Sequence, residues 1–327
     1  MQPLADTLVV DLTRLLPGAY ASRELRRLGA RVVRVEAPEG DAMRTTAHAW
    51  DTALRAGTES VVCDLKADAA LARALCARAD VVLEGFRPGV AERLGIGPAD
   101  VPETVVYCSI TGFGAEPAHS LRAGHDLNYV GWAGALEDTA PGLPPVQVAD
   151  LGAGALGAVT AVLAALLERA RTGKGGHVTV SMTHGAHDLV AHRLGGDPVP
   201  RLLTGGLACY RVYATADGRH LTVAALEPKF FRRLCELLGR PELAERHYEA
   251  EQEALARELA GILAGRDLAS WLELFDGEDV CVGPVWTRDE AAAVFGGGEN
   301  ADPVPLGAHT ENWRRELQLA HEPESSR

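Results

Sequence analysis

The chain is 327 residues long, which exceeds one typical single-core domain and predicts either one large domain or two unequal ones. Hydrophobic residues make up 47% and charged residues 24% of the chain, the usual composition of a globular protein with a sizeable core. The formal net charge of −13 argues against a general nucleic-acid-binding protein, although a local basic patch could still bind an anionic ligand.

The N-terminal part alternates apolar strands with helices. Residues 7–12 (TLVVDL) are β-branched and apolar, residues 17–29 have helical spacing that ends at a glycine, and residues 31–36 (RVVRVE) form a second apolar strand. That order is a βαβ unit, and it predicts a parallel sheet buried on both faces. The pattern continues with strands at 60–65, 81–86 and 105–110 and with helices at 67–79 and near 90–94. We therefore predict an α/β fold with a Rossmann-like layer.

A second apolar region follows the predicted sheet. Residues 150–171 are rich in Ala, Leu and Gly and predict a buried helix, which TGKGG ends before a strand at 177–182. The apolar stretch at 151–167 contains three glycines and a threonine and is shorter than a bilayer span. The helix is expected to pack inside the large domain.

The composition changes after this helix. LGGDPVP and LLTGG, between residues 194 and 206, predict linkers, and the pair YRVYAT and HLTVAAL around Asp217-Gly218 predicts a β-hairpin. Helical patterns follow at 228–238 and 251–275. These features predict a large domain at 1–193, a small α+β domain at 207–285, and a segment at 286–327 that returns to the large domain.

The cysteines and the N-terminus indicate the compartment. The six cysteines are widely separated, and none has the spacing of a metal site, so we expect reduced structural thiols and no metal centre. The first eleven residues lack a basic segment followed by an apolar run, and we expect no secretory signal. These patterns predict a cytoplasmic protein without a membrane or nucleic-acid partner.

Three short segments carry candidate catalytic side chains. His125 in AGHDLNY lies before an Asp-started helix, Asp150 in VADLGAG ends a predicted strand and opens a Gly-rich helix, and Glu227 in ALEPKFF precedes Pro228. A His beside the free amides of a helix N-terminus can help to hold an oxyanion. Each of the three could equally be a simple N-cap residue.

Together with EGFRPGVAERLGIGP (84–98) and RTGKGGHVTVSM (171–182), these segments resemble the α-methylacyl-CoA racemase branch of the family III CoA-transferases. The resemblance extends from about Leu8 to Val285. It implies an interlocked homodimer of ring-like subunits, each with a Rossmann-like large domain and a small domain, and an active site between the subunits. The implied activity is inversion of the α-carbon of a 2-methylacyl-CoA-like thioester.

The resemblance also implies roles for single residues. His125 and Asp150 would be the two acid/base groups on opposite faces of the α-carbon, and Glu227 from the other subunit would hold the imidazole of His125. Inversion by deprotonation needs a base on one face, an acid on the other and a stabilised enolate, for which the backbone N–H of Asp126 is the candidate donor.

The resemblance implies that CoA enters as part of the thioester substrate, without a prosthetic group. The positions matching CoA contacts are Lys66, Glu84, Arg87, Arg93 and Tyr129, although the cations could be ordinary surface residues. Two departures concern positions that are usually basic: Ala37 in VEAP, and the segment from Ala56 to Ser60. Either CoA binds weakly, or the acyl carrier differs.

Three other functions compete with racemisation. In a family III CoA-transferase, Asp150 would attack the acyl-CoA as a nucleophile. The missing basic residues suggest instead a non-catalytic homologue, or one repurposed in a biosynthetic pathway. A dinucleotide dehydrogenase is disfavoured because DLTRLLPGAY follows the first strand without a GxGxxG motif.

Overall fold

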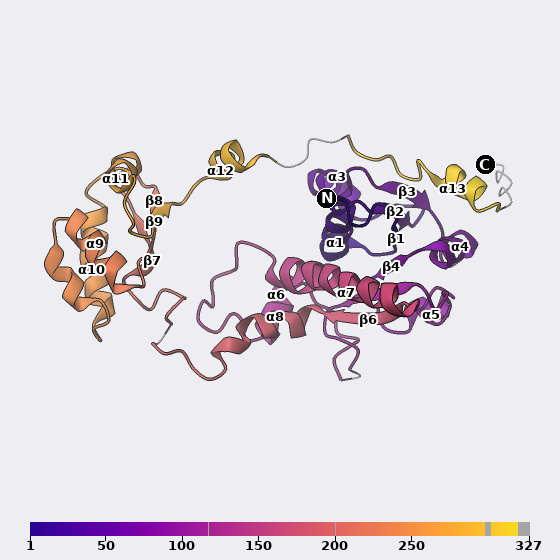
Figure 1. The fold of residues 1–327 in the computed structure, drawn as a ribbon, viewed down its shortest axis with the longest axis horizontal. Helices are drawn as coiled ribbons and strands as arrows, with labels where there is room; N and C mark the ends of the chain where they lie inside the picture. The colour runs from indigo at the N-terminus through magenta and orange to yellow at the C-terminus, as the bar shows by residue number, and fades with distance from the viewer. Residues whose placement is uncertain (117, 200, 298–301, 320–327) are drawn as a thin grey trace. The chain divides into compact units, whose positions relative to one another are not determined.

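The computed structural model describes residues 1–116, 118–199, 201–297 and 302–319. The chain divides into two compact units, which are described separately below. Unit 1 comprises Met1–His192 together with the described residues 302–319, and unit 2 comprises Arg193–Gly297. Figure 1 labels the elements of both units.

Unit 1 contains a six-stranded, fully parallel sheet in the order β3-β2-β1-β4-β5-β6. The strands are β1 (Leu8–Asp11), β2 (Arg31–Glu36), β3 (Glu59–Val62), β4 (Val81–Glu84), β5 (Val106–Thr111) and β6 (Gly176–Ser181). Both faces of the sheet are buried: Val9 belongs to one hydrophobic core and Val10 to the other, because successive side chains of a strand point to opposite faces. The predicted Rossmann-like layer is confirmed.

Helices cover the two faces of this sheet (Figure 1). Helix α1 packs against η1 and α7, while Leu71 and Leu75 of α4 belong to the core on the other face. The helices of this part of the chain are α1 (Leu15–Arg27), α2 (Met43–Thr46), α3 (His48–Arg55), α4 (Ala70–Arg78), α5 (Val90–Arg93), α6 (Asp126–Trp132), η1 (Val148–Leu156), α7 (Gly157–Thr172), α8 (Met182–Val190), η2 (Ala191–Arg193) and α13 (Thr310–Glu316).

The apolar helix differs from its prediction in two respects. It begins as a π-helix, η1, so Asp150 lies in its first turn, and the residues directly before it form turns and bends rather than the strand that we predicted. The continuous segment Val148–Thr172 has 25 residues and contains an 18-residue window with a mean hydropathy of 1.8, so length and composition alone would allow it to span a membrane. However, Ala149, Ala155 and Ala158 are fully buried in the core of unit 1, as expected for the core helix of an α/β domain.

Unit 2 is a small α+β unit. Its antiparallel sheet has the order β7-β8-β9, with β7 (Tyr210–Ala214), β8 (His220–Ala224) and β9 (Val282–Pro284). The predicted hairpin is confirmed, and Gly218 in its turn has φ 74°, a conformation that favours glycine. The helices are α9 (Pro228–Leu237), η3 (Pro241–Arg246), α10 (Gln252–Leu263), α11 (Leu268–Phe275) and α12 (Arg288–Phe295).

Three details of unit 2 were not predicted. The pattern at 251–275 forms two helices rather than one, because Gly265 follows α10 and the carboxylate of Asp267 caps the next helix by accepting from Ser270 N at 2.8 Å. The sequence did not reveal β9. Helix α12 belongs to unit 2, although we assigned residues 286–297 to the return segment.

The described residues 302–319 cover the free edge of β3. His309 N donates to Ser60 O at 2.9 Å, and Val62 N donates to Thr310 Oγ1 at 3.0 Å. Trp313 is fully buried in the core beneath β3, and its indole N–H donates to Glu59 Oε2 at 2.6 Å. This segment therefore satisfies the backbone of an otherwise open sheet edge.

Candidate active site

Two cavities lie beyond the carboxyl ends of β1 and β4, where the strand order of the sheet reverses. Crevices at such a switch point are the usual ligand sites of open parallel sheets. Cavity A has a volume of about 560 Å³ and cavity B of about 700 Å³. The lining of both includes Thr13, Arg14, Gly85, Phe86 and Arg87, which follow β1 and β4.

His125 lines cavity A from the N-cap position of α6. Its backbone is extended there, with φ −125°, and its N–H donates to Asn128 Oδ1 at 3.0 Å. The preceding turn is held by Tyr129, whose hydroxyl donates to Gly124 O at 2.5 Å and whose ring packs edge-on against Phe113. His125 is thus an N-cap residue, as the sequence allowed, and from this position it also presents an exposed imidazole to the cavity.

Asp150 lines the same cavity from the first turn of η1. Its N–H donates to Asp126 Oδ1 at 2.8 Å, which ties η1 to α6. Burial and, secondarily, the negative charge of Asp126 raise the pKa of Asp150 to about 6, while the charge of His125 opposes this shift. Asp150 is therefore suited to exchange protons near neutral pH. π-Helical turns are rare in proteins, and those that occur are often found at functional sites.

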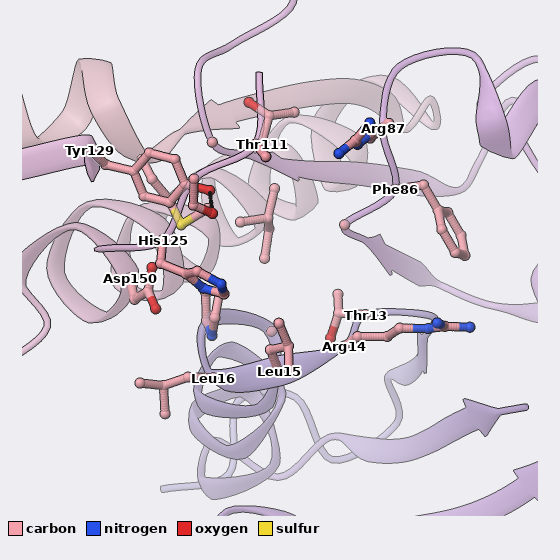
Figure 2. Close-up of a pocket in the computed structure, with 18 of the residues that line it drawn as sticks. Thr13, Arg14, Leu15, Leu16, Phe86, Arg87, Thr111, His125, Tyr129 and Asp150 are labelled. Atoms are coloured by element: carbon pink, nitrogen blue, oxygen red, sulfur yellow. Dashed lines mark hydrogen bonds between the residues drawn. The ribbon is translucent and has the colours of Figure 1, made fainter. Parts of the chain in front are cut away.

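Figure 2 shows His125, Asp150 and Tyr129 on one side of the cavity, with Arg14, Phe86 and Arg87 on the other. The sequence-predicted pair His125 and Asp150 therefore meets in one cavity, although the two residues come from separate elements. Two titratable groups facing one space can act as the acid and the base of a single proton-transfer reaction.

The other predicted catalytic positions lie elsewhere. Asp126 is the first residue of α6, so its N–H belongs to the first turn, whose amides have no intrahelical acceptor. Its side chain is not among the described groups that line either cavity and instead binds the Asp150 amide. Glu227 is exposed in unit 2, at the N-cap position of α9 before Pro228.

The predicted CoA-binding cations gather around cavity B. Lys66, Arg87 and Arg93 all line it, and Arg87 also lines cavity A. Glu84 is not among the described residues that line either cavity: it is buried, and its Oε2 accepts from Phe86 N at 2.6 Å. Burial raises the pKa of Glu84. Tyr129 lines cavity A rather than cavity B.

The two departures from the basic pattern differ in their structural setting. Ala37 lines cavity B, so the missing charge there concerns that cavity directly. Residues 56–60 are not among the described residues that line cavity B. Within them, Glu59 pairs with Arg31, and Ser60 bonds Glu36. A lack of cations at 56–60 therefore says little about the charge of cavity B.

Several lining residues were missed at the sequence level. Arg14 lines both cavities, and Arg122 lines cavity A with its guanidinium 5.0 Å from the centre of the Trp132 ring. Arg14 lies two residues after the end of the strand that we predicted at 7–12, so the switch-point rule could have identified it. Met43 and Trp50 also line cavity A, but they lie on α2 and α3, which no sequence pattern predicted.

The thiols and metal ligands add no further chemistry here. Of the six free cysteines, Cys281 is exposed and the other five are buried. Within the described part of the chain, no group of three or more His, Cys, Asp or Glu side chains could hold a metal ion.

Comparison with known proteins identifies the family. The model of CoA-transferase family III matches residues 4–295, which is most of the chain. The protein belongs to CoA-transferase family III. This family membership confirms the resemblance that the motifs indicated, and it makes the chain a member of a group of enzymes that act on CoA thioesters.

Relatives of this family III protein include both racemases and transferases. The chain is 35% identical over 304 residues to α-methylacyl-CoA racemase of Homo sapiens, covering 86% of this chain and 77% of that protein. It is 30% identical over 317 residues to succinyl-CoA:glutarate CoA-transferase of Mus musculus, covering 87% and 72%. The crystal structure of a CAIB/BAIF family protein from Brucella suis matches with a TM-score of 0.80 and 28% identity, covering 97% of this chain and 99% of that one.

Proposed function

We propose that this family III protein is a racemase or epimerase that inverts the α-carbon of a 2-methylacyl-CoA-like thioester. The observation that carries the proposal is the pair of titratable groups in cavity A, where Asp150, with a pKa raised to about 6, and His125 face one space from two elements. Sequence similarity to racemases over most of the chain supports the same reading.

In this mechanism one residue of the pair removes the α-proton, and the other protonates the opposite face. The intermediate enolate carries negative charge on the thioester oxygen, and the first-turn amide of Asp126 is the proposed donor to that oxygen. Glu227 of the partner subunit in a homodimer would hold the imidazole of His125. A carboxylate in that place would fix the ring orientation and stabilise its charged form.

The CoA moiety is proposed to bind in cavity B, with its phosphates near Lys66, Arg87 and Arg93. These cations line that cavity, and charge-assisted hydrogen bonds to phosphate are the strongest contacts available there. Phe86 and Arg87 line both cavities, so a thioester lying past them would place its acyl part in cavity A.

The second candidate function is CoA transfer. Transferases are also among the relatives at 30–32% identity, and a carboxylate in the position of Asp150 could attack a thioester carbonyl to form a covalent intermediate. In that reaction the α-proton stays in place, and His125 has no direct role.

The deciding experiment follows the α-proton. A panel of 2-methylacyl-CoA thioesters is incubated with the protein in deuterated water, and NMR measures deuterium at the α-carbon. Racemisation requires exchange of that proton with solvent. The proposal fails if no thioester acquires deuterium while mass spectrometry detects an acyl or CoA adduct on Asp150.

A further inference from the structure

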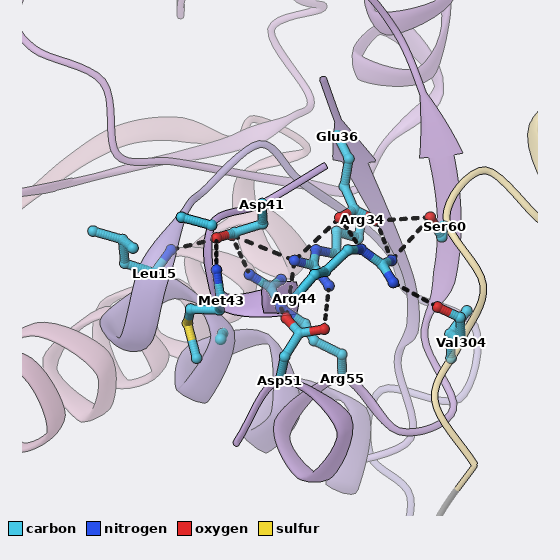
Figure 3. Close-up of polar contacts among 12 residues, drawn as sticks. Leu15, Arg34, Glu36, Asp41, Met43, Arg44, Asp51, Arg55, Ser60 and Val304 are labelled. Atoms are coloured by element: carbon cyan, nitrogen blue, oxygen red, sulfur yellow. Dashed lines mark hydrogen bonds and ion pairs between the residues drawn. The ribbon is translucent and has the colours of Figure 1, made fainter. Parts of the chain in front are cut away.

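A buried ionic cluster lies next to cavity A (Figure 3). Its central members are Arg34, Asp41, Asp51 and Arg55, whose side chains are all less than 10% exposed. Arg34 contacts Asp51 at 3.0 Å and Asp41 at 3.4 Å, and Arg55 contacts Asp41 at 3.7 Å. Arg55 also pairs with Asp11 at the end of β1.

Such a cluster calls for an explanation beyond stability. Removing several charges from water costs so much free energy that a buried ion pair is often no more stabilising than apolar residues of the same volume. Groups of this kind are better explained by what they hold in place. The relevant question is therefore which parts of the site the cluster contacts.

Asp41 connects the cluster to the wall of cavity A. Its Oδ2 accepts from Leu15 N at 3.2 Å, and its Oδ1 accepts from Met43 N at 2.9 Å. Leu15 and Met43 both line cavity A, as does Trp50 on the neighbouring helix α3. One carboxylate thus holds the backbone of two apolar wall residues that are 28 positions apart in the sequence.

The conformation of Leu15 shows that this position is constrained. Its φ is 62°, in the left-handed region that residues with a β-carbon rarely adopt, so the backbone is strained there. Its side chain is nevertheless 42% exposed beside the cavity rather than packed into the core. The strained backbone of Leu15 therefore places an apolar side chain at cavity A rather than in the core.

We propose that Asp41 is a positioning residue that fixes Leu15 and Met43 as an apolar wall for the acyl chain, and that Arg34 and Arg55 of the buried ionic cluster hold the Asp41 carboxylate in place. This inference rests on the proposed function, in which cavity A receives the acyl part of a thioester. It assigns selectivity for apolar acyl chains to a group that lines cavity B but is not among the described residues that line cavity A.

The test compares two substitutions in the same cluster. Asp41→Asn removes a charge and leaves an amide that can accept from only one of the two backbone N–H groups, since its NH₂ faces the other. Asp51→Asn is the matched control: it removes the same charge, from a site equally buried and shared by the same two arginines, but its carboxylate has no contact with Leu15 or Met43. Leu15→Gly relieves the strained backbone and deletes the wall itself.

Calorimetry on the full-length protein measures the Kd for CoA and for 2-methyldecanoyl-CoA. Asp41→Asn and Leu15→Gly should each weaken the acyl-CoA by roughly tenfold relative to CoA, since they loosen or remove contacts worth one or two buried methylenes. Asp51→Asn should leave this ratio unchanged. The proposal is overturned if either Asp41→Asn or Leu15→Gly keeps the wild-type ratio, or if Asp51→Asn changes it as much as Asp41→Asn does.

The readout separates this inference from the proposed function. The ratio of the Kd values for acyl-CoA and CoA is measured without any reaction. A protein that exchanges no α-proton can therefore still show the expected ratios, and in that case only the racemase proposal fails. Conversely, deuterium exchange with an unchanged binding ratio in both Asp41→Asn and Leu15→Gly would remove only the positioning role. If Asp41→Asn does not fold, Asp41→Glu, which keeps the charge but moves the carboxylate by one methylene, takes its place in the comparison with Asp51→Asn.

Discussion

At the scale of single residues, the proposed site has two titratable groups whose surroundings differ. Asp150 is half-buried and its pKa is raised to about 6, whereas His125 is exposed at an N-cap. In a two-base mechanism each enantiomer loses its α-proton to a different residue. This asymmetry makes the roles of the two residues separable by substitution.

We expect His125→Ala and Asp150→Asn each to reduce racemisation by about 10²–10⁴-fold, the usual contribution of a general acid or base. CoA binding should be unchanged. Each variant should impair α-proton exchange of one enantiomer more than that of the other, measured separately for each by NMR in deuterated water. Equal loss of exchange for both enantiomers in both variants would contradict the two-base assignment.

The raised pKa of Asp150 predicts a pH dependence. For the enantiomer whose proton Asp150 removes, the carboxylate form is needed, so kcat/KM should rise with pH through about 6. For the opposite enantiomer Asp150 acts as the acid, so the rate should fall above about 6. Asp126→Asn removes one cause of the raised pKa and should move both limbs to lower pH. Rates that do not vary between pH 5 and 7 would refute this expectation.

The cations of cavity B give a third residue-level prediction. Lys66→Ala and Arg93→Ala should each weaken CoA by about 1–3 kcal/mol, the range for a hydrogen bond to a charged group. Arg171→Ala is a suitable control, because Arg171 is exposed on α7 and pairs with Glu168 on the same helix. The CoA site is misassigned if both cavity variants bind CoA as tightly as the wild type in a calorimetric titration.

At the scale of elements, the sequence predicted the helices and strands whose apolar residues repeat at a regular spacing, and it missed those that lack such a repeat. The strands of the sheet are short apolar runs between helical patterns, so their positions along the chain could be predicted. Residue type also indicated the N-cap of α6 and the end of α7 at Gly173. Helices α2 and α3 lack an apolar stripe because α3 buries Asp51 and Arg55 instead. The wall of cavity A that these helices provide was therefore invisible to pattern analysis.

The C-terminal segment makes a prediction about stability. Trp313 is fully buried and also bonds Glu59, so Trp313→Ala should cost about 3–5 kcal/mol in the free energy of unfolding of unit 1. Because the two units can unfold in separate transitions, urea denaturation is followed for both. Trp271→Ala is the control, since Trp271 is buried in unit 2 and should affect the other transition. Unchanged unfolding in Trp313→Ala would show that the segment adds little.

At the scale of the whole molecule, the family fixes the class of substrate but not the reaction. The reversal of strand order places both cavities at the carboxyl ends of the strands, where Lys66 and Arg93 line cavity B and His125 and Asp150 line cavity A. The proposed site needs Glu227, which belongs to unit 2. Leucines are exposed on η1, α7 and α8 (Leu156, Leu167 and Leu189), which is consistent with the proposed homodimer.

If His125 works with Glu227 of a partner subunit, the active protein is a homodimer and two inactive variants can restore each other. In a mixed dimer of His125→Ala and Glu227→Ala subunits, one site combines both substitutions, while the other combines an intact His125 with an intact Glu227. Co-expression that pairs subunits at random makes half of the dimers mixed, so about a quarter of all sites should be active, compared with almost none in either variant alone. If the two residues instead met within one subunit, no site of the mixed dimer would be intact, and co-expression would restore nothing.

Light scattering on the wild type at micromolar concentration provides the companion measurement, because a monomer there would exclude the shared site whatever the activities show.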